Sequence, residues 1–288
     1  MTKRALVLGG GGPVGSAWET GVIAGLAEAG VDISNAGWIM GTSAGSVVGA
    51  QLALGHTPAA MMATEVANAF RARTAAPAAA GPAPDLSALM GAMMRRPPSG
   101  PMPEELRRDL GQLSLNGKTI SEDDFISRFS GLVDDATAWP ARFACTAVET
   151  LTGEFQVWSK DALAPLARAI ASSCSVPSIY PAITIGGRRY MDGGMRSGTN
   201  ADLAKGYDKV LLFAVMPPAF AAFMQPSIEA ELAIVRESGG QTLLVAPNAG
   251  AGEAFGPNLM DGSRRDIIAE AGRVQGRADA ARIGAFWG

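Results

Sequence analysis

Short apolar runs alternate with longer helical periodicities along the first part of the chain. Residues 5–8 form a continuous apolar run that ends at glycine, which is typical of a buried parallel strand. Apolar side chains recur at helical spacing over 14–29, and Gly30 follows as a residue that commonly ends helices. Residues 38–40 predict a second short strand, and 44–54 predict an apolar helix. The order strand, helix, strand, helix predicts an α/β fold.

Further strands and helices are predicted in the second half of the chain. The predicted strands cover 143–148, 155–158, 183–191, 210–215 and 242–245. The first two of these form a hairpin, and a Gly-Gly turn divides the third. Helices are predicted over 162–172 and from Ser263, which we expect to cap the closing helix. Because strands and helices interleave along most of the 288 residues, we expect one α/β domain over 1–288.

Residues 74–103 break this alternation and are rich in alanine, proline and methionine. Inside this segment, 85–96 predicts a short helix that begins at Asp85, carries a Met/Leu face and ends in two arginines. A Met-rich helix between flexible arms suits a mobile lid over an apolar site. A disordered insertion that tolerates changes of sequence explains the same composition, and both interpretations stay open.

Charge and composition exclude several classes of function. The formal net charge is −3 and no basic stripe is present, so nucleic acid is not an expected partner. Cys145 and Cys174 stand in no metal-binding motif, and the chain has a single histidine. We therefore expect no metal site and no cofactor. The two cysteines are typical of buried thiols in a reducing compartment.

The sequence also bears on location in the cell. The apolar run after Lys3 and Arg4 is four residues long, too short for the core of a signal peptide. No stretch approaches the ~20 apolar residues that a membrane-spanning helix needs. We therefore expect a cytoplasmic protein that can rest on a membrane surface.

The pentad Gly41-Thr42-Ser43-Ala44-Gly45 is the strongest chemical motif in the chain. The pattern G-x-S-x-G marks a nucleophilic serine on a sharp turn between a strand and a helix, and both elements are predicted here. Serine hydrolases usually use a histidine as base, but the only histidine, His56, follows Ser43 by thirteen residues. Along a helix this spacing corresponds to roughly 15–20 Å. Either the pentad is accidental, or the base is a carboxylate.

A glycine-rich loop over residues 9–15 joins the first predicted strand to the first predicted helix. Backbone amides at a helix N-terminus form an anion site, and two anions suit this loop. One is a dinucleotide pyrophosphate, with Asp32 near the position of the ribose-binding acid. The other is the oxyanion of an acyl-transfer intermediate. Because Asp32 precedes the second strand instead of ending it, the pentad shifts the balance toward the oxyanion.

Asp192 is the candidate carboxylate. It ends a predicted strand and is followed by Gly193 and Gly194, which places it on a tight turn. A plain Asp-Gly turn without catalytic function is the alternative. In the hydrolytic interpretation Ser43 attacks an acyl carbonyl, Asp192 accepts its proton and glycine amides hold the oxyanion. Because an aspartate is a weak base in water, this chemistry requires a desolvated cleft that raises its pKa.

Three ordered blocks, at 8–21, 41–46 and 171–194, resemble the patatin-like phospholipases. Members of that family are serine lipid acyl hydrolases with a Ser–Asp dyad. They are built on a central, mostly parallel sheet between two layers of helices. The resemblance implies that Ser43 is the nucleophile, that Asp192 is its partner and that the oxyanion loop is Gly10, Gly11 and Gly12. It also implies a lipid or another acyl ester as substrate.

One departure from the family concerns the residues that follow the glycines. Many members carry Arg or Lys there, whereas this chain has Pro13 and Val14, so a neutral acyl ester suits the loop as well as a phospholipid. Two alternatives to a hydrolase stay open: a Rossmann-like nucleotide-binding protein that uses the 9–15 loop, and a catalytically silent lipid-binding member. We also expect Asn200 to brace the turn at Asp192.

Overall fold

A computed structural model describes residues 2–74, 87–134 and 136–288. Within these ranges eight strands form one sheet in the order β5-β6-β3-β2-β1-β7-β8, and β4 pairs with β3 beside this path. The strands are β1 (Arg4–Leu8), β2 (Trp38–Gly41), β3 (Phe143–Glu149), β4 (Phe155–Ser159), β5 (Ile183–Ile185), β6 (Arg188–Asp192), β7 (Lys209–Phe213) and β8 (Gln241–Val245). The pairs from β3 through β2, β1 and β7 to β8 are parallel, whereas β4, β5 and β6 join by antiparallel pairing.

Every strand predicted from the sequence is present, including the hairpins β3–β4 and β5–β6. The central strand β1 explains why the apolar runs are continuous. Leu6 and Leu8 pack into the core on one face of the sheet, whereas Ala5 and Val7 pack into a separate core on the other face. Because both faces are buried, the strand has no polar positions after Arg4, as expected for a parallel sheet covered on both sides.

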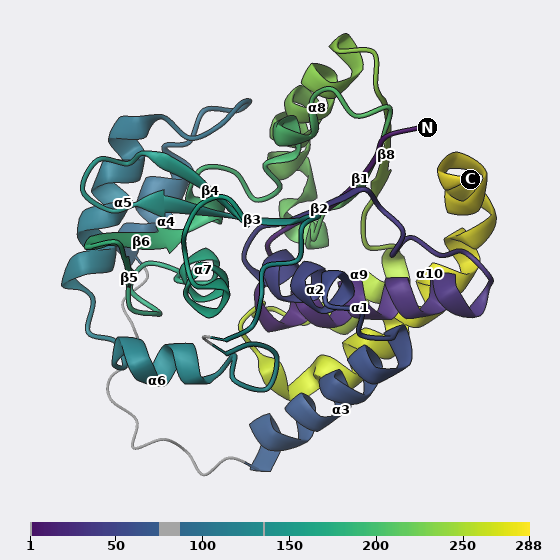
Figure 1. Ribbon diagram of the computed structural model, residues 1–288, viewed down its shortest axis with the longest axis horizontal. Helices are drawn as coiled ribbons and strands as arrows, with labels where there is room; N and C mark the ends of the chain where they lie inside the picture. Colours follow the sequence, from purple (N-terminus) through teal and green to yellow (C-terminus); the bar gives the residue numbers. More distant parts are fainter. Residues whose placement is uncertain (1, 75–86, 135) are drawn as a thin grey trace.

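Helices cover both faces of the sheet, which gives the three layers of an α/β/α fold (Figure 1). They are α1 (Gly12–Glu28), α2 (Ala44–Ala53), α3 (Pro58–Thr74), α4 (Ser87–Met94), α5 (Glu104–Asn116), α6 (Glu122–Ser127), α7 (Leu166–Ser173), α8 (Ala221–Glu237), α9 (Ala249–Phe255) and α10 (Arg265–Trp287). Figure 1 shows α8 on one side of the sheet and α1, α2 and α10 on the other. No helix in the described ranges is long and apolar enough to cross a membrane.

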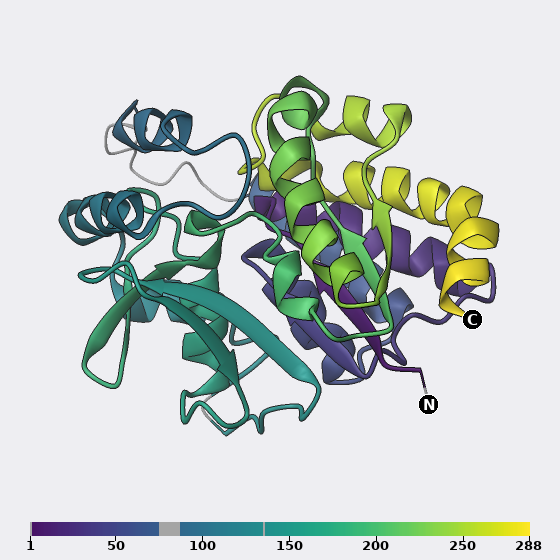
Figure 2. The same cartoon turned by 90° about the horizontal axis from the view of Figure 1, so that it is seen from above.

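The helices α4 and α5 lie beside each other at the end of the molecule that is remote from both chain termini (Figure 2). Leu89 and Ala92 of α4 share a small apolar core with Leu110 of α5 and with Met191 of β6. The predicted Met-rich helix is therefore present as α4 and is packed against the sheet. Its expected first residue, Asp85, lies outside the described residues.

Two predicted helix starts are wrong. The helix predicted from 162 begins at Leu166, because Pro165 occupies its N-cap and the residue before a proline is biased away from helical geometry. The closing helix begins at Arg265 and not at Ser263. The Asp261 carboxylate accepts the backbone N–H of Ser263 at 2.9 Å, which holds Ser263 in a 3-10 turn before the helix.

The long helices α1 and α10 cross through a seam of glycines. A Cβ atom built on Gly21 would lie 2.0 Å from the carbonyl oxygen of Ala269, and one on Gly25 would lie 2.1 Å from that of Arg273. The fit is reciprocal, since a Cβ atom on Gly276 of α10 would lie 2.3 Å from the carbonyl oxygen of Val22. The two backbones therefore meet without intervening side chains, and α10 holds α1 and its glycine loop against the sheet.

We expect Gly21→Ala to destabilise the fold by about 1–3 kcal/mol or more, because its methyl group has no room against α10. Helix propensity alone predicts the opposite sign, a gain of up to ~1 kcal/mol. The matched control is Gly91→Ala in α4, where a Cβ atom would meet nothing within 4 Å and propensity decides. Urea unfolding of both variants measures the difference. Equal stability of the two variants would contradict the close approach of α1 and α10.

Candidate active site

Ser43 stands on the turn between β2 and α2, where it is the N-cap residue of the helix. Its backbone has φ 52° and ψ −118°, a conformation that side-chain-bearing residues rarely adopt. Such strain persists only where the surrounding structure enforces it. The turn holds the hydroxyl group at the positive end of the α2 dipole, which is the geometry of a nucleophile elbow.

The two glycines of the pentad are required by packing. A Cβ atom on Gly41 would lie 2.3 Å from the carbonyl oxygen of Gly45, and one on Gly45 would lie 2.2 Å from that of Leu8. The Gly45 amide also donates to the carbonyl oxygen of Gly9 at 3.0 Å. The elbow is therefore pressed against β1 and bonded to the start of the glycine loop.

Asp192 ends β6 and reaches the same edge of the sheet as Ser43. The last pair of β2 and β3 is Gly41 with Cys145, and two residues farther along β3 Ala147 pairs with Asp192 of β6. Ser43 follows Gly41 by two residues, so Ser43 and Asp192 flank β3 at one level. Gly193 must be glycine at this point, because a Cβ atom there would lie 2.1 Å from Oγ1 of Thr146.

The Asp192 carboxylate is desolvated, with 2% of its surface exposed. Its Oδ1 atom accepts the Gly194 N–H at 2.7 Å, whereas Oδ2 has no hydrogen-bond partner among the described residues. Burial raises the pKa of Asp192 to about 7, and hydrogen bonding from the Ser43 hydroxyl and the Gly194 N–H opposes this rise. The Ser43 hydroxyl is therefore close to the Asp192 carboxylate, although Oδ2 has no hydrogen-bond partner among the described residues. Apo catalytic contacts are often this loose, and a pKa near 7 suits a base at neutral pH.

The glycine loop lies beside Ser43, since a Cβ atom on Gly10 would be 3.3 Å from the Cβ atom of Ser43. The Gly10 amide donates to the carbonyl oxygen of Gly198 at 2.8 Å and is therefore not free to bind an oxyanion in this conformation. The amides of Gly11 and Gly12 have no acceptor among the described residues, as expected at the start of α1. They are the free donors of the loop.

A buried polar network ties the turn at Ser43 to the turn at Asp192. The hydroxyl groups of Thr42 and Thr146 lie 2.9 Å apart, and the Asn200 amide donates to Thr42 Oγ1 at 3.0 Å. The same amide reaches the Gly193 carbonyl oxygen at 3.3 Å, which is the bracing expected of Asn200. Arg196 donates to Oδ1 of Asn200 at 2.7 Å and fixes the orientation of the side chain. The roles of Thr42 and Thr146 are not apparent from the sequence.

Ser43 lines a cavity of about 650 Å³, whereas Asp192 is not among the described residues of its wall. The described lining residues are Gly12, Pro13, Ser16, Ser43, Ala44, Val47, Asn68, Arg71, Ala72, Phe125, Arg128, Phe129, Cys174, Val176, Tyr180, Met260, Gly262 and Arg265. Apolar side chains from α2, α6 and residues 174–180 form much of the wall. A cavity of this volume and lining fits an acyl chain next to the nucleophile.

The model of the family described as patatin-like phospholipase matches residues 6–205. The chain belongs to this family. The matched region contains the glycine loop, Ser43 and Asp192, which are the three parts of the site described above. A search of curated proteins finds no match.

Solved structures similar to this family member include two bacterial proteins. VipD from Legionella pneumophila is 12% identical with a TM-score of 0.45, and the match covers 97% of this chain and 67% of VipD. The type III effector ExoU is 15% identical with a TM-score of 0.45, over 98% of this chain and 53% of ExoU. The matched chain of the heterodimeric ExoU-SpcU complex from Pseudomonas aeruginosa is 18% identical with a TM-score of 0.41. This match covers 97% of the present chain and 51% of the matched chain. The chain therefore spans about two thirds of VipD and about half of ExoU.

Asp32 and His56 lie apart from the patatin-type site. Both line a different surface pocket, together with Arg142. Because Asp32 precedes β2, it lies at the opposite edge of the sheet from the loop that follows β1. Its carboxylate accepts the Ser34 N–H at 2.8 Å in a local turn. This position does not suit the alternative interpretation in which Asp32 serves the glycine loop as a ribose-binding acid.

Both cysteines are free. Cys145 is buried in β3, and Cys174 lines the cavity with its Sγ donating to the Ser43 carbonyl oxygen at 3.3 Å. Burial raises the pKa of the Cys174 thiol, so this group is a neutral part of the wall and not a second nucleophile. Within the described ranges, no three His, Cys, Asp or Glu side chains come together in the manner of a metal site.

None of the described residues of α4 lines the cavity at Ser43. The side chain of Arg96, just after this helix, donates to Ser227 Oγ of α8 at 2.6 Å. Residues 75–86, which join α3 to α4, lie outside the described residues. The lid function of 74–103 therefore stays a prediction.

Proposed function

We propose that this protein is a lipid acyl hydrolase that cleaves acyl esters with Ser43 as nucleophile and Asp192 as base. Membership in the patatin-like phospholipase family supports acyl-ester hydrolysis. The observation that carries the dyad is the buried Asp192 carboxylate, 2% exposed and with a pKa of about 7, at the level of Ser43. A carboxylate in this state accepts a serine proton far more readily than one in water.

In the first half of the reaction, Ser43 Oγ attacks the acyl carbonyl carbon while Oδ2 of Asp192 takes the hydroxyl proton. The amides of Gly11 and Gly12, which have no other acceptor among the described residues, bind the oxyanion that forms. Collapse of this intermediate breaks the ester bond, and Asp192 returns the proton to the departing alcohol oxygen. Ser43 is left as an acyl-enzyme ester.

In the second half, a water molecule attacks the acyl-enzyme carbonyl carbon and gives a proton to Asp192. The same two amides stabilise the second oxyanion. When the bond to Ser43 Oγ breaks, the proton passes from Asp192 to the serine, and a carboxylic acid leaves. Asp192 therefore serves as base and acid in turn, and a pKa near neutral pH suits both roles.

The pH dependence of hydrolysis tests this proposal. We expect kcat/KM for a short p-nitrophenyl acyl ester to rise about tenfold per pH unit below an apparent pKa near 7 and to level off above it. The reason is that only the deprotonated Asp192 accepts the proton of Ser43. Because p-nitrophenol itself titrates in this range, acid release in a pH-stat is the appropriate measurement.

The control is the uncatalysed hydrolysis at each pH, which is subtracted. A profile that shows no ionisation between pH 5 and 9 would contradict the assignment of Asp192 as base. Lipid binding without any turnover would favour a catalytically silent member of the family.

A further inference from the structure

Three arginines line the cavity that opens at Ser43, and each comes from a different part of the chain. Arg71 lies near the end of α3, Arg128 follows α6 and Arg265 begins α10. The described lining residues include no aspartate or glutamate. The described wall therefore carries basic and no acidic side chains, although the net charge of the chain is −3.

Only one of these arginines is neutralised by a carboxylate. Arg265 donates to the buried Glu65 at 2.6 and 3.0 Å, so this pair adds no net charge. Arg71 donates to the neutral Asn68 side chain, and the Arg128 guanidinium lies over the rings of Phe125 and Tyr180 at 5.8 and 5.5 Å. Neither arginine has a carboxylate partner among the described residues.

No neighbouring acid is part of the described cavity wall. Asp261 is adjacent to lining residues but accepts the Ser263 N–H at 2.9 Å and is absent from the wall. Asp266 is paired at 3.0 Å with Arg73, which follows Arg71 on the same helix.

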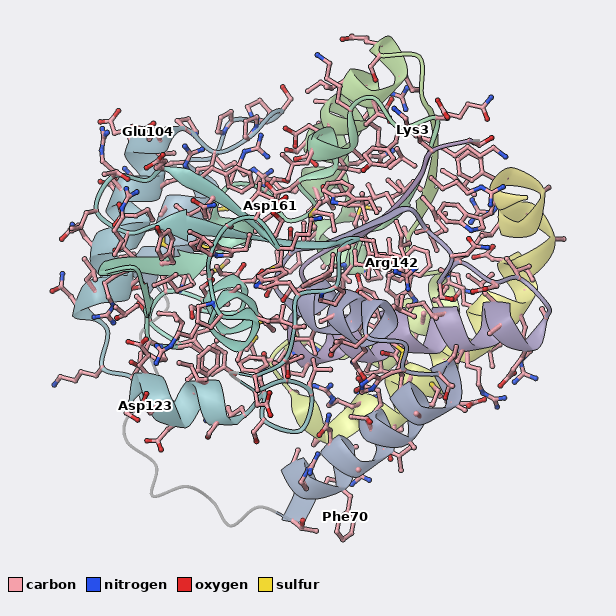
Figure 3. All side chains as sticks on the ribbon, in the orientation of Figure 1. Lys3, Phe70, Glu104, Asp123, Arg142 and Asp161 are labelled. Atoms are coloured by element: carbon pink, nitrogen blue, oxygen red, sulfur yellow. The ribbon has the colours of Figure 1, made fainter. Side chains whose placement is uncertain are left out.

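The side chains of Arg71 and Arg128 are exposed, so both guanidinium groups are accessible to a ligand in the cavity. In Figure 3, the labelled Phe70 lies in the last part of α3 and precedes Arg71 in the sequence. The labelled Asp123 lies in α6, which ends just before Arg128.

We propose that Arg71 and Arg128 bind a phosphate group on the alcohol part of the substrate, so that the enzyme selects acyl esters of net negative charge. This inference rests on the proposed acyl hydrolase function. The apolar wall near Ser43 holds the acyl chain, and the two guanidinium groups line the same cavity from α3 and from the end of α6. Guanidinium is the side-chain group best suited to bind phosphate through two parallel hydrogen bonds.

Two observations favour an anionic over a zwitterionic group. Arg128 covers the faces of Phe125 and Tyr180, which are the surfaces that a quaternary ammonium group would need. The two unpaired arginines also repel such a cation. The glycine loop has Pro13 and Val14 where a basic residue is common in the family, and Arg71 and Arg128 supply that charge from elsewhere in the cavity.

The test compares three short-chain substrates below their critical micelle concentrations: dihexanoyl-glycerophosphate, dihexanoyl-glycerophosphocholine and dihexanoylglycerol. For the wild type we expect kcat/KM to favour the glycerophosphate over the neutral glycerol ester roughly tenfold to a hundredfold, with the phosphocholine between them. In the double variant Arg71→Gln/Arg128→Gln this ratio should fall close to one. Circular dichroism establishes that the variant is folded.

The matched control is Arg73→Gln, which removes an arginine of the same helix that is paired with Asp266 and lies outside the cavity lining. It should keep the wild-type ratio. An equal ratio in the wild type and the double variant overturns the inference, and so does a wild-type preference for the neutral ester. Competitive inhibition by inorganic phosphate at concentrations below the KM of the glycerophosphate also overturns it, because the site would then serve free phosphate.

Failure of the proposed function gives a different result. If the wild type hydrolyses none of the esters, calorimetric binding of dihexanoyl-glycerophosphate to the wild type and the double variant decides the inference. Affinity that drops at least tenfold in the double variant supports the phosphate site. Absence of binding to the wild type, or equal binding to both proteins, overturns it.

Discussion

Replacing Ser43 with alanine is expected to lower the turnover of acyl esters by roughly 10⁴-fold or more. The hydroxyl is the only group at the elbow that can form the acyl-enzyme, and no other serine lines the cavity except Ser16 among the described residues. The fold should be unchanged, because the backbone at Ser43 already carries a Cβ atom at φ 52° and alanine adds no new strain. Initial rates on short p-nitrophenyl esters, with circular dichroism of each protein, measure this effect.

A matched control for this variant is Ser178→Ala. Ser178 also has a positive φ, 65°, but it is not among the residues that line the cavity. It should retain full turnover. A fluorophosphonate probe gives an independent readout, since mass spectrometry should locate the label on Ser43 in the wild type and find none in Ser43→Ala. Full activity of Ser43→Ala, or labelling of another serine, would contradict the assignment of Ser43 as the nucleophile.

The sheet can be predicted from the sequence because its central strands are buried on both faces. In β1 the residues that alternate between the two cores are all apolar, so the run from Ala5 to Leu8 is unmistakable. The same holds for β7, which is buried after Lys209. The edge strand β8 is only partly buried, yet its predicted ends, like those of β7, agree with the structure within one or two residues. Local sequence decides these elements because burial leaves few polar positions in them.

Helix ends are harder to predict, because groups outside the helix decide them. Ser263 is a good capping residue by type, but the Asp261 carboxylate binds its N–H and moves the start of α10 to Arg265. Pro165 moves the start of α7 in the same way. The long helix α3 is not among the predicted elements, although Pro58 at its first position is a recognised sign of a helix start.

In the candidate site, too, some features can be predicted from local sequence, whereas others arise only when distant segments come together in the fold. Ser43 and Asp192 can be found because a Cβ atom on the glycines beside them would lie only 2.1 to 2.3 Å from neighbouring atoms, and the need for glycine is visible in the sequence. The bond between Thr42 and Thr146, and the arginines of the cavity, leave no local mark. Thr42 and Thr146 are 104 residues apart, so only the folded sheet brings them together. The hydrogen bond from the Gly10 amide to the Gly198 carbonyl oxygen cannot be predicted from the sequence for the same reason.

Replacing Asp192 with asparagine is expected to lower kcat by roughly 10³-fold or more and at the same time to stabilise the fold above neutral pH. Asparagine keeps the shape and the acceptor for the Gly194 N–H but cannot take the proton of Ser43. The residual rate should also lose the ionisation near pH 7, which distinguishes loss of the base from loss of structure. Activity assays and the pH profile of the variant measure both effects.

The stabilisation follows from the sign of the pKa shift at Asp192, which burial raises from 3.8 to about 7. Between these two values the folded protein holds a proton that the unfolded chain has released, so the stability of the wild type falls as the pH rises through this window. An asparagine side chain does not titrate and has no such dependence. The free energy of unfolding of Asp192→Asn should therefore exceed that of the wild type by up to about 4 kcal/mol above pH 7, and the two should converge near pH 4.

Urea unfolding at pH 4, 6 and 8 measures this difference. The control is Asp161→Asn at the exposed Asp161, which should behave like the wild type (Figure 3). A pH-independent difference between Asp192→Asn and the wild type would mean that the pKa of Asp192 is the same in the folded and unfolded states, and the desolvated base proposed here would then be wrong.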